Sequence, residues 1–354
     1  VPGNSPQATK HGPALMVMKK LLTSLLFLTL ASAAATALPA GSLEEVRKAA
    51  GQGDAASQFS LGQRYEAGKG GVERDPEEAV VWYRKAAQQG YAKAQTNLGN
   101  FYRAGKGGLD RDYDEALRWY RKAAEQGDSK AMINLAGMYA TGQGVKKDEA
   151  EALQWLEKAA SKGDTQAMVQ LGMLYKTGKG VEKNPSMSTE WFRLAASKGD
   201  VVAQHNLGLA YYFGTGVKKN YTESARWHRK AAEKGYPPAE YSMGLRYDNG
   251  DGVKQSYTEA ARWYEKAARQ GHPSAQNNLG ILYRNGQGVK RDYAEAMAWF
   301  RKAAERGYAP AQYNLGKMYL KGQGVAVDRE EARKWLTRAA DAGYPAAKKA
   351  LDAL

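Results

Sequence analysis

Two short stretches of glycine and lysine contain residue types that could act on a phosphate or an acyl group. Gly62 to Gly70 is ordered like a nucleotide phosphate loop, but its glycines are one residue too far apart, a glycine replaces the hydroxyl residue, and no strand is expected before it. Lys176 to Gly178 matches the Lys-Thr-Gly motif of serine β-lactamases, yet the chain contains no Ser-x-x-Lys to supply a nucleophile. Neither stretch predicts an enzyme.

The histidines give no metal-binding pattern. They are His11, His205, His228 and His272, and none has a second His or a Cys at ligand spacing. The chain has no cysteine, which excludes disulfides, thiolate metal sites and cysteine nucleophiles. His228 takes the place of an aromatic or leucine residue in a repeating pattern, so we expect it to pack. These residues predict no catalytic site, no metal and no cofactor.

The residues near the N-terminus have the pattern of a secretory leader. Met18-Lys19-Lys20 precedes an apolar run over 21–35, and Ala35-Thr36-Ala37 fits a cleavage site. A membrane anchor is the alternative, but this run is shorter than the ~20 residues of a spanning helix and is diluted by Thr and Ser. We therefore expect a periplasmic or secreted mature chain from Leu38, with no integral membrane segment after cleavage. Residues 1–17 fit neither the leader nor the fold.

A repeat of 36 or 37 residues organises the rest of the chain. The spacing between successive tryptophans is 37 residues once and 36 thereafter, and each tryptophan has a tyrosine 16 or 17 residues before it. The composition, with 43% hydrophobic residues, 39 glycines and few β-branched residues, favours closely packed helices. A fixed period of this length predicts a stack of structural repeats. The eight tryptophans are Trp82, Trp119, Trp155, Trp191, Trp227, Trp263, Trp299 and Trp335.

Each repeat carries the signals of two helices joined by a Gly-x-Gly-Val turn. In "AQTNLGNFY" the Ala, Leu and Tyr lie four residues apart on one stripe, which we expect to be buried. The glycine after the leucine, such as Gly99, should let the second helix approach closely. An N-cap residue stands seven residues before each tryptophan, and a glutamate three residues later predicts a capping box in seven repeats, Met187 being the exception. The N-caps are Asp75, Asp112, Asp148, Asn184, Asn220, Ser256, Asp292 and Asp328.

The motifs "AxxQxxLGxxYxxGxGV" and "DxxEAxxWYxKAAxxG" resemble those of the Sel-one-like repeat, a relative of the tetratricopeptide repeat. The resemblance covers 54–343 in eight units, after an upstream and leader segment over 1–37. Residues 38–53 and 344–354 resemble lone helices that cap the two ends. The resemblance implies an all-α, right-handed superhelical solenoid of about eight helix-turn-helix repeats. Departures are small: Ala136 replaces the usual glycine, Met243 replaces the leucine, and the fourth repeat lacks its glutamate.

Members of that family are mostly non-catalytic adaptors that gather partner proteins on a curved surface. Exported bacterial members are associated with envelope assembly, polysaccharide export or host contact. The resemblance therefore implies an adaptor that binds a protein or peptide in a concave groove. A β-lactamase-like hydrolase, a label given to some relatives, is the remaining alternative, for which this sequence supplies no residues.

The first-helix residues that point away from the buried stripe should line this groove. They stand two before, two after and five after the stripe leucine, at about 100° per residue. Of the 22 tyrosines, three have no other place in the pattern, and we predict these as apolar anchors, with Arg284 or Lys176 setting the register. The alternative is that neighbouring helices bury these side chains against each other. The predicted partner-binding residues are Phe59, Lys176, His205, Leu209, Tyr212, Tyr241, Leu245, Arg284 and Tyr313, with Tyr212, Tyr241 and Tyr313 as the anchors.

Lysines in the turns suggest a second surface. The formal net charge is +15, and stacked repeats should align these lysines along one edge that could bind an acidic polysaccharide or membrane head groups. A solvated edge is the alternative, and export argues against nucleic acid. The lysines of this basic edge are Lys146, Lys147, Lys218, Lys219 and Lys290.

An amide side chain also recurs just before the stripe leucine. It could bond to a bound peptide, or it could tie one repeat to the next. The amides are Asn97, Asn134, Asn206, Asn278 and Asn314.

Overall fold

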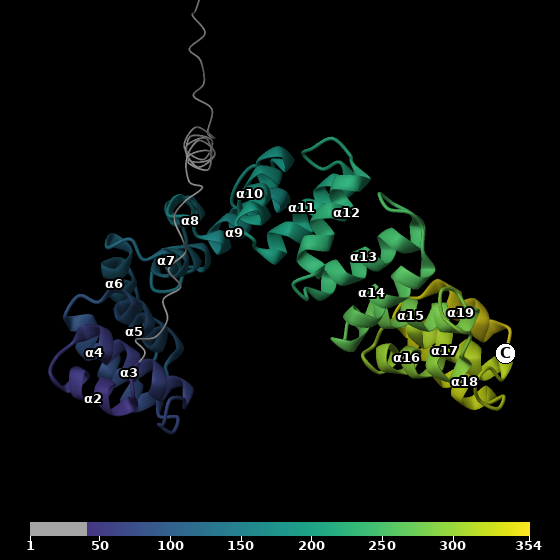
Figure 1. Ribbon diagram of the computed structural model, residues 1–354, viewed down its shortest axis with the longest axis horizontal. Coiled ribbons are helices and arrows are strands. Elements are labelled where there is room, and N and C mark those ends of the chain that lie inside the picture. The colour runs from purple at the N-terminus through teal and green to yellow at the C-terminus, as the bar shows by residue number, and fades with distance from the viewer. Residues whose placement is uncertain (1–40) are drawn as a thin grey trace, which may run out of the picture. The chain divides into compact units, whose positions relative to one another are not determined.

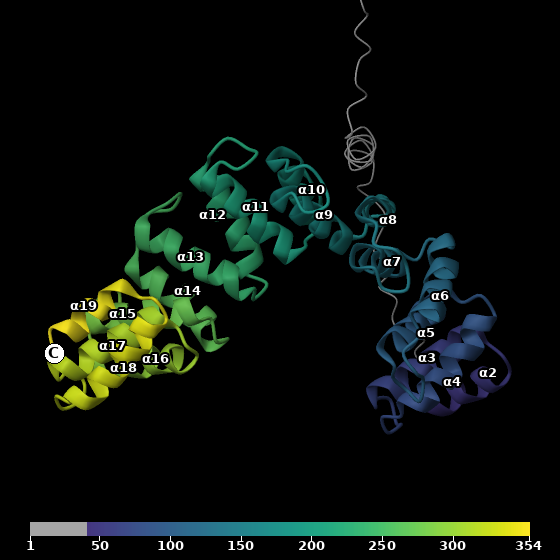
Figure 2. The same cartoon turned by 180° about the vertical axis from the view of Figure 1, so that it is seen from behind.

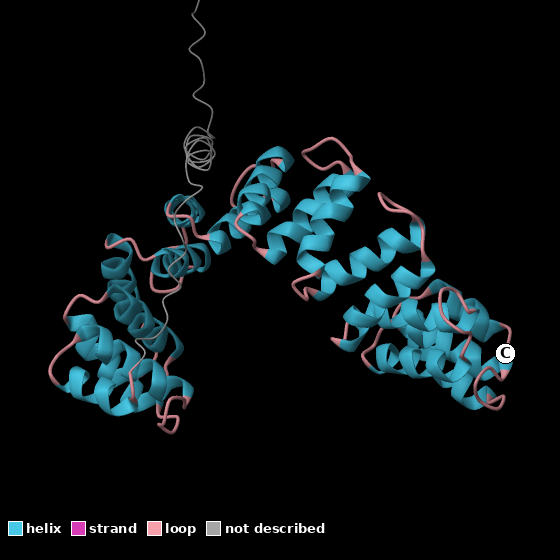
Figure 3. Ribbon diagram, in the orientation of Figure 1, coloured by secondary structure: helices cyan, strands magenta, loops and turns pink. Residues whose placement is uncertain are grey.

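The computed structural model describes residues 41–354, and within these residues the chain forms 18 helices and no strand (Figure 3). The all-α repeat fold expected from the sequence is confirmed. The predicted leader and residues 38–40 of the predicted N-terminal cap lie outside the described residues.

Each repeat consists of a first and a second helix in succession. The first helices are α3 (Ala55–Ala67), α5 (Ala92–Ala104), α7 (Ser129–Thr141), α9 (Thr165–Thr177), α11 (Val201–Phe213), α13 (Pro237–Asn249), α15 (Pro273–Asn285) and α17 (Ala309–Lys321). The second helices are α4 (Pro76–Gln88), α6 (Tyr113–Glu125), α8 (Glu149–Ser161), α10 (Pro185–Ser197), α12 (Tyr221–Ala232), α14 (Tyr257–Arg269), α16 (Tyr293–Glu305) and α18 (Arg329–Asp341). Two shorter helices flank them, α2 (Leu43–Gly51) and α19 (Pro345–Asp352).

The described residues divide into two compact units, 41–194 and 195–354, with the division inside α10. In the first unit α2 to α9 pack on one another in chain order, and in the second unit α11 to α19 do the same (Figures 1 and 2). Each helix therefore contacts mainly its neighbours along the chain, as in other solenoids.

Close packing within a repeat depends on the glycine after the stripe leucine. A Cβ added to Gly244 would lie 2.3 Å from Cδ1 of Tyr264, the ring that follows Trp263 on the second helix. In the third repeat Ala136 replaces this glycine, and the residue after the tryptophan is the smaller Leu156; both are buried. The glycine thus lets the two helices approach, as the sequence predicted.

The N-caps of the second helices are confirmed, but the capping boxes predicted for them are wrong. Asp148 Oδ1 accepts two 3.0 Å hydrogen bonds from backbone N–H groups in the first turn of α8. The N–H of Asp148, which a capping box would give to a glutamate, donates instead to the carbonyl of Tyr139 at 2.9 Å. Four of the seven glutamates pair instead with a cation three residues on, as Glu115 does with Arg118 at 2.7 Å. The cap residue therefore also anchors the turn to the first helix.

We expect Asp148→Ala to lower the free energy of unfolding by about 1 kcal/mol, because it leaves two N–H groups of α8 without an acceptor. Asp148→Asn, which installs the residue found in the fourth and fifth repeats, should cost only a few tenths of a kcal/mol. Urea unfolding of both variants checks this prediction. A loss in Asp148→Asn as large as that in Asp148→Ala would contradict it.

Hydrogen bonds from side chains that recur in the motif also join consecutive repeats. Gln95 Nε2 donates to the carbonyl of Ala87 at 3.1 Å, and equivalent glutamines bond in the same way at Gln204, Gln276 and Gln312. Arginines of the second helices donate to the tyrosine hydroxyl of the following repeat, as from Arg229 Nη2 to Tyr247 at 2.7 Å. The recurrence of glutamine in the motif was the signal for the first of these contacts, which the sequence interpretation did not assign.

Candidate functional site

The first unit contains a cleft over its first helices, which we call the first-helix cleft. Its volume is about 870 Å³, and it is lined by α3, the start of α5, the residues that begin α7 and Asp164. It contains Phe59, which the sequence predicted for partner binding, and Asn97, one of the recurrent amides. A cleft of this size between first helices offers a concave, partly apolar surface to a ligand or a protein segment.

The apolar part of the cleft is an aromatic cluster. The Phe59 ring lies 5.2 Å from that of Tyr91 and 5.7 Å from that of Tyr83, both tilted. Phe59 and Tyr91 are half-buried, whereas Tyr83 is buried beneath them. Packing against Tyr83 and Tyr91 therefore holds Phe59 in place and leaves one side of its ring to the cleft.

Polar groups of the cleft are oriented by hydrogen bonds. Tyr83 Oη donates to Glu66 Oε2 at 2.5 Å, and burial first, then this bond, raises the pKa of Tyr83. Thr96 Oγ1 donates to Asp128 Oδ1 at 3.0 Å, and the same oxygen accepts the N–H that caps α7. These side chains present fixed acceptors to anything that enters the cleft.

Cations and carboxylates are interspersed around the cleft. Lys93 on α5 and Lys130 on α7 are exposed, and Asp164 lies among the lining residues. Mixed charge over an apolar floor suits a protein surface better than a polymer of one sign. The sequence interpretation missed these residues because they lie at helix starts and in loops. The predicted groove positions, counted from the stripe leucine, do not include them.

The three predicted anchor tyrosines are half-buried, and each contacts another aromatic ring. The Tyr241 ring stacks on His272 at 4.7 Å, and that of Tyr313 lies 5.2 Å from Tyr344. Tyr212 lies beside the exposed Phe213 at 4.9 Å. Tyr241 and Tyr313 therefore pack against the N-cap residues of α15 and α19, whereas the ring contact between Tyr212 and Phe213 lies within one helix.

The other predicted groove residues differ in their surroundings. Lys176 is exposed at the end of α9, and Leu209 is half-buried on α11. The His205 ring lies 5.2 Å from that of His228, and Leu245 packs against the core around Tyr264. Arg284 is held by a hydrogen bond, in which its Nη1 donates to Asn314 Oδ1 at 3.0 Å.

Two of the recurrent amides, Asn134 and Asn314, bond between repeats, whereas Asn206 Nδ2 donates to the carbonyl of Val202 in its own helix at 2.9 Å. Asn134 Nδ2 donates to Asn100 Oδ1 at 2.9 Å, and Asn314 Nδ2 donates to Asn277 Oδ1 at 2.9 Å. Asn97 is different, because it lines the first-helix cleft.

The five lysines of the predicted basic edge are exposed. Lys147 pairs with Glu149 at 2.7 Å, and a shallow hollow beside it also contains Asp148. Lys219 Nζ lies 4.7 Å above the Tyr221 ring. Carboxylates therefore border part of this edge, which weakens the field that a polyanion would meet.

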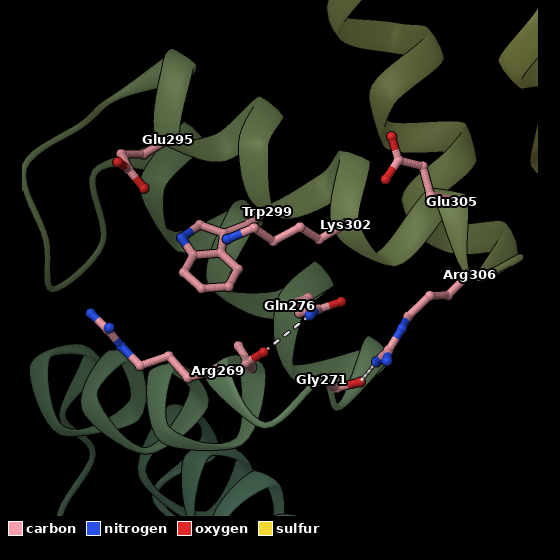
Figure 4. Close-up of a pocket in the computed structure, with 9 residues that line it drawn as sticks. Arg269, Gly271, Gln276, Glu295, Trp299, Lys302, Glu305 and Arg306 are labelled. Atoms are coloured by element: carbon pink, nitrogen blue, oxygen red, sulfur yellow. Dashed lines mark hydrogen bonds between the residues drawn. The ribbon is translucent and has the colours of Figure 1, made fainter.

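Lysines of the second helices have a packing role. Lys302 Nζ lies 4.0 Å above the Trp299 ring in a pocket of about 770 Å³ between α14, α15 and α16 (Figure 4). In the same pocket Gln276 donates to the carbonyl of Ala268 at 3.0 Å, and Arg306 donates to the carbonyl of Gly271 (Figure 4). These polar groups join consecutive repeats, so we interpret the pocket as part of the packing between repeats.

The stretches with catalytic residue types occupy structural positions. Gly62 lies inside α3 and Gly68 is its left-handed C-cap, while Lys176 to Gly178 forms the end of α9. Burial raises the pKa of Glu157 to about 7, and this carboxyl lies near Tyr175.

Among residues 41–354, no group of three or more His, Cys, Asp or Glu side chains could hold a metal ion. Over the same stretch, no helix is both long and apolar enough to cross a membrane.

Comparison with known proteins gives one consistent result. The family model of the Sel1 repeat matches eight times, at residues 55–91, 92–128, 129–164, 165–200, 201–236, 237–272, 273–308 and 309–344. A search of curated proteins gave no significant match.

Two solved structures are similar along most of the chain. One is a protective antigen with an SLR fold, present in uropathogenic Escherichia coli strains; it shares 38% identity and a TM-score of 0.77, over 88% of this chain and 67% of that one. The other is a Sel1 repeat protein from Oxalobacter formigenes, with 32% identity and a TM-score of 0.68, over 99% of this chain and 97% of that one.

Proposed function

The chain belongs to the Sel1 repeat family, whose members are generally protein-interaction scaffolds, and from this premise we propose that it is an exported adaptor that binds a partner protein in its first-helix cleft. The adaptor acts by non-covalent binding and carries out no reaction. Its partner is a folded protein or a segment of one.

The observation that carries the proposal is the combination of surfaces in the cleft. The Phe59 ring offers an apolar contact, Glu66 and Asp128 offer fixed acceptors, and Lys93 and Lys130 offer exposed cations. An apolar centre with a polar, charged rim is the usual composition of a protein interface. Because Phe59 and Glu66 are already held by neighbours, a partner loses little free energy in ordering them.

Export is part of the proposal. It is supported by the leader pattern over 18–37 and by the similarity to an Escherichia coli protein described as a protective antigen. An adaptor outside the cytoplasm would meet envelope or host proteins.

A paired charge reversal tests the binding surface. The variant Lys93→Glu with Lys130→Glu changes two exposed cations of the cleft, and a glutamate in the first turn of α5 or α7 suits the helix dipole. The matched control, Lys106→Glu with Lys179→Glu, makes the same charge change at two exposed turn lysines of the same unit that do not line the cleft.

The mature chain, immobilised, is used to capture proteins from envelope and host-cell extracts, and the Kd of the captured partner is then measured for each variant. We expect the cleft variant to bind at least about tenfold more weakly and the control to bind within about threefold of the unmutated chain. Capture of no protein would overturn the adaptor proposal. Equal binding by both variants would overturn the assignment to the cleft.

A further inference from the structure

Phe213 is exposed at a position where no other repeat has an apolar side chain of this size. Its exposed fraction is 68%, and the residue before the C-cap glycine is Ala, Thr, Asn or Lys in the other seven repeats. We propose that Phe213 is the centre of a second binding surface, on the unit 195–354, that takes an acidic protein segment carrying an apolar side chain. This inference rests on the proposed adaptor function and names the chemistry of one partner segment.

Phe213 belongs to a contiguous cluster, which we call the aromatic patch: Tyr212, Phe213 and Tyr221. The Tyr212 ring meets Phe213 edge to face at 4.9 Å and lies 5.1 Å from the Tyr221 ring. The patch joins the end of α11 to the start of α12, and Tyr221 is also exposed. Exposed apolar clusters of this kind mark interaction sites, and tyrosine is enriched at binding hot spots.

The aromatic patch is held in position before any partner arrives. Tyr212 Oη donates to Asp251 Oδ2 at 3.1 Å. On either side, α11 ends at the left-handed Gly214, and Asn220 caps α12 by accepting the N–H of Glu223 at 3.0 Å. A partner would therefore pay little conformational entropy to use these rings.

Two cations lie over ring faces of the patch, and their positive charge favours a partner with negative charge. Arg246 Cζ lies 3.5 Å from the centroid of Tyr212, and Lys219 Nζ lies 4.7 Å from that of Tyr221. Arg246 is 4% exposed, and its Nε and Nη1 have no hydrogen-bond partner. Asp251, the carboxylate beside the patch, already accepts bonds from Tyr212 and Asn249.

This arrangement selects against a cationic ligand. A lysine or arginine of a partner would normally use a tyrosine face, but these faces already carry Arg246 and Lys219 and would repel it. A carboxylate next to the patch would gain attraction from the same two cations, while an apolar side chain covers Phe213.

Selection from a displayed library of short random peptides tests the inference. Peptides are selected on the mature chain and counter-selected on the variant Phe213→Asn, which carries the residue found at this position in the sixth and seventh repeats. Affinities of the selected peptides are then measured for the unmutated chain, Phe213→Asn, Lys219→Gln and a control, Val327→Gln. Lys219→Gln installs the sixth-repeat residue, and Val327 is an exposed apolar residue in the turn of the eighth repeat.

We expect selected peptides to combine an aromatic residue or leucine with adjacent Asp or Glu. They should bind Phe213→Asn at least about tenfold more weakly, lose affinity for Lys219→Gln with reduced salt dependence, and bind Val327→Gln unchanged. Failure to select peptides, or selection of basic ones, would overturn the inference. The adaptor proposal is judged separately, because it fails only if the chain captures no protein from extracts.

Discussion

Replacing Gly252 with alanine is expected to lower the free energy of unfolding by about 3 kcal/mol. Gly252 is the second glycine of a Gly-x-Gly-Val turn and has a φ of +74°. A Cβ there would lie 2.1 Å from the carbonyl oxygen of Tyr221 and 2.7 Å from the backbone nitrogen of Thr222. Because these are backbone atoms at the start of α12, they cannot move aside as a flexible side chain could.

Gly235 provides a matched control for this effect. Its φ is +77°, but a Cβ added to it would meet nothing within 4 Å. Gly235→Ala should therefore cost only the strain of a left-handed alanine, about 1 kcal/mol. Urea unfolding of the two variants checks the difference. Equal losses would show that the turn does not dock on the preceding second helix.

The second large effect is a loss of stability in acid caused by His228. Burial first, then the nearby His205 and Arg246, lower the pKa of His228 from its ordinary 6.5 to about 3. The unfolded chain therefore binds more protons than the folded chain between these values, so the free energy of unfolding falls as pH falls through this window. The expected contribution between pH ~7 and ~5 is a loss of about 2 kcal/mol.

The groups around His228 also disfavour its protonation in the folded chain. His205 on α11 and Arg246 on α13 are potential or permanent cations, while Ser224 on its own helix lies 3.3 Å from Nδ1. His228 Nε2 is buried and has no hydrogen-bond partner. Protonation would therefore place a charge in an apolar and already cationic environment.

The variant His228→Phe isolates this contribution. Phenylalanine stands at the equivalent position in the fourth and seventh repeats, where Phe300 packs beside Gly280 as His228 packs beside Gly208. We expect the pH dependence of unfolding between pH ~7 and ~5 to decrease by about 2 kcal/mol in this variant. An unchanged pH dependence would show that His228 is not the responsible group.

Local features of the fold could be predicted because they are encoded within one repeat. The N-cap of Asp148, the left-handed glycines and the contact between Gly244 and Tyr264 each depend on residues close in sequence or repeated at a fixed spacing. The capping box failed because the N–H of the cap residue bonds to a tyrosine carbonyl of the first helix, as Asp148 bonds to Tyr139. A motif of four residues contains no information on that competing acceptor.

Binding surfaces were harder to predict because they depend on contacts between repeats. Tyr241 and Tyr313 look unassigned in the repeat pattern, but His272 and Tyr344, the N-cap residues of α15 and α19, lie against them. Phe59, which the first-helix pattern singled out, lines the first-helix cleft, whereas Lys130 and Asp164 enter the cleft from later repeats. Phe213 lies outside the stripe positions, and its signal was its departure from the repeat pattern.

The most direct test of the proposed first-helix cleft is a lysine-acetylation footprint of the mature chain with and without its captured partner. Lys93 and Lys130 line the cleft from the second and third repeats, whereas Lys85 and Lys122 lie on the second helices of the first and second repeats. Our account predicts that the partner protects Lys93 and Lys130 from acetylation and leaves Lys85 and Lys122 as reactive as before. Protection of Lys85 and Lys122 with no change at Lys93 and Lys130 would contradict it.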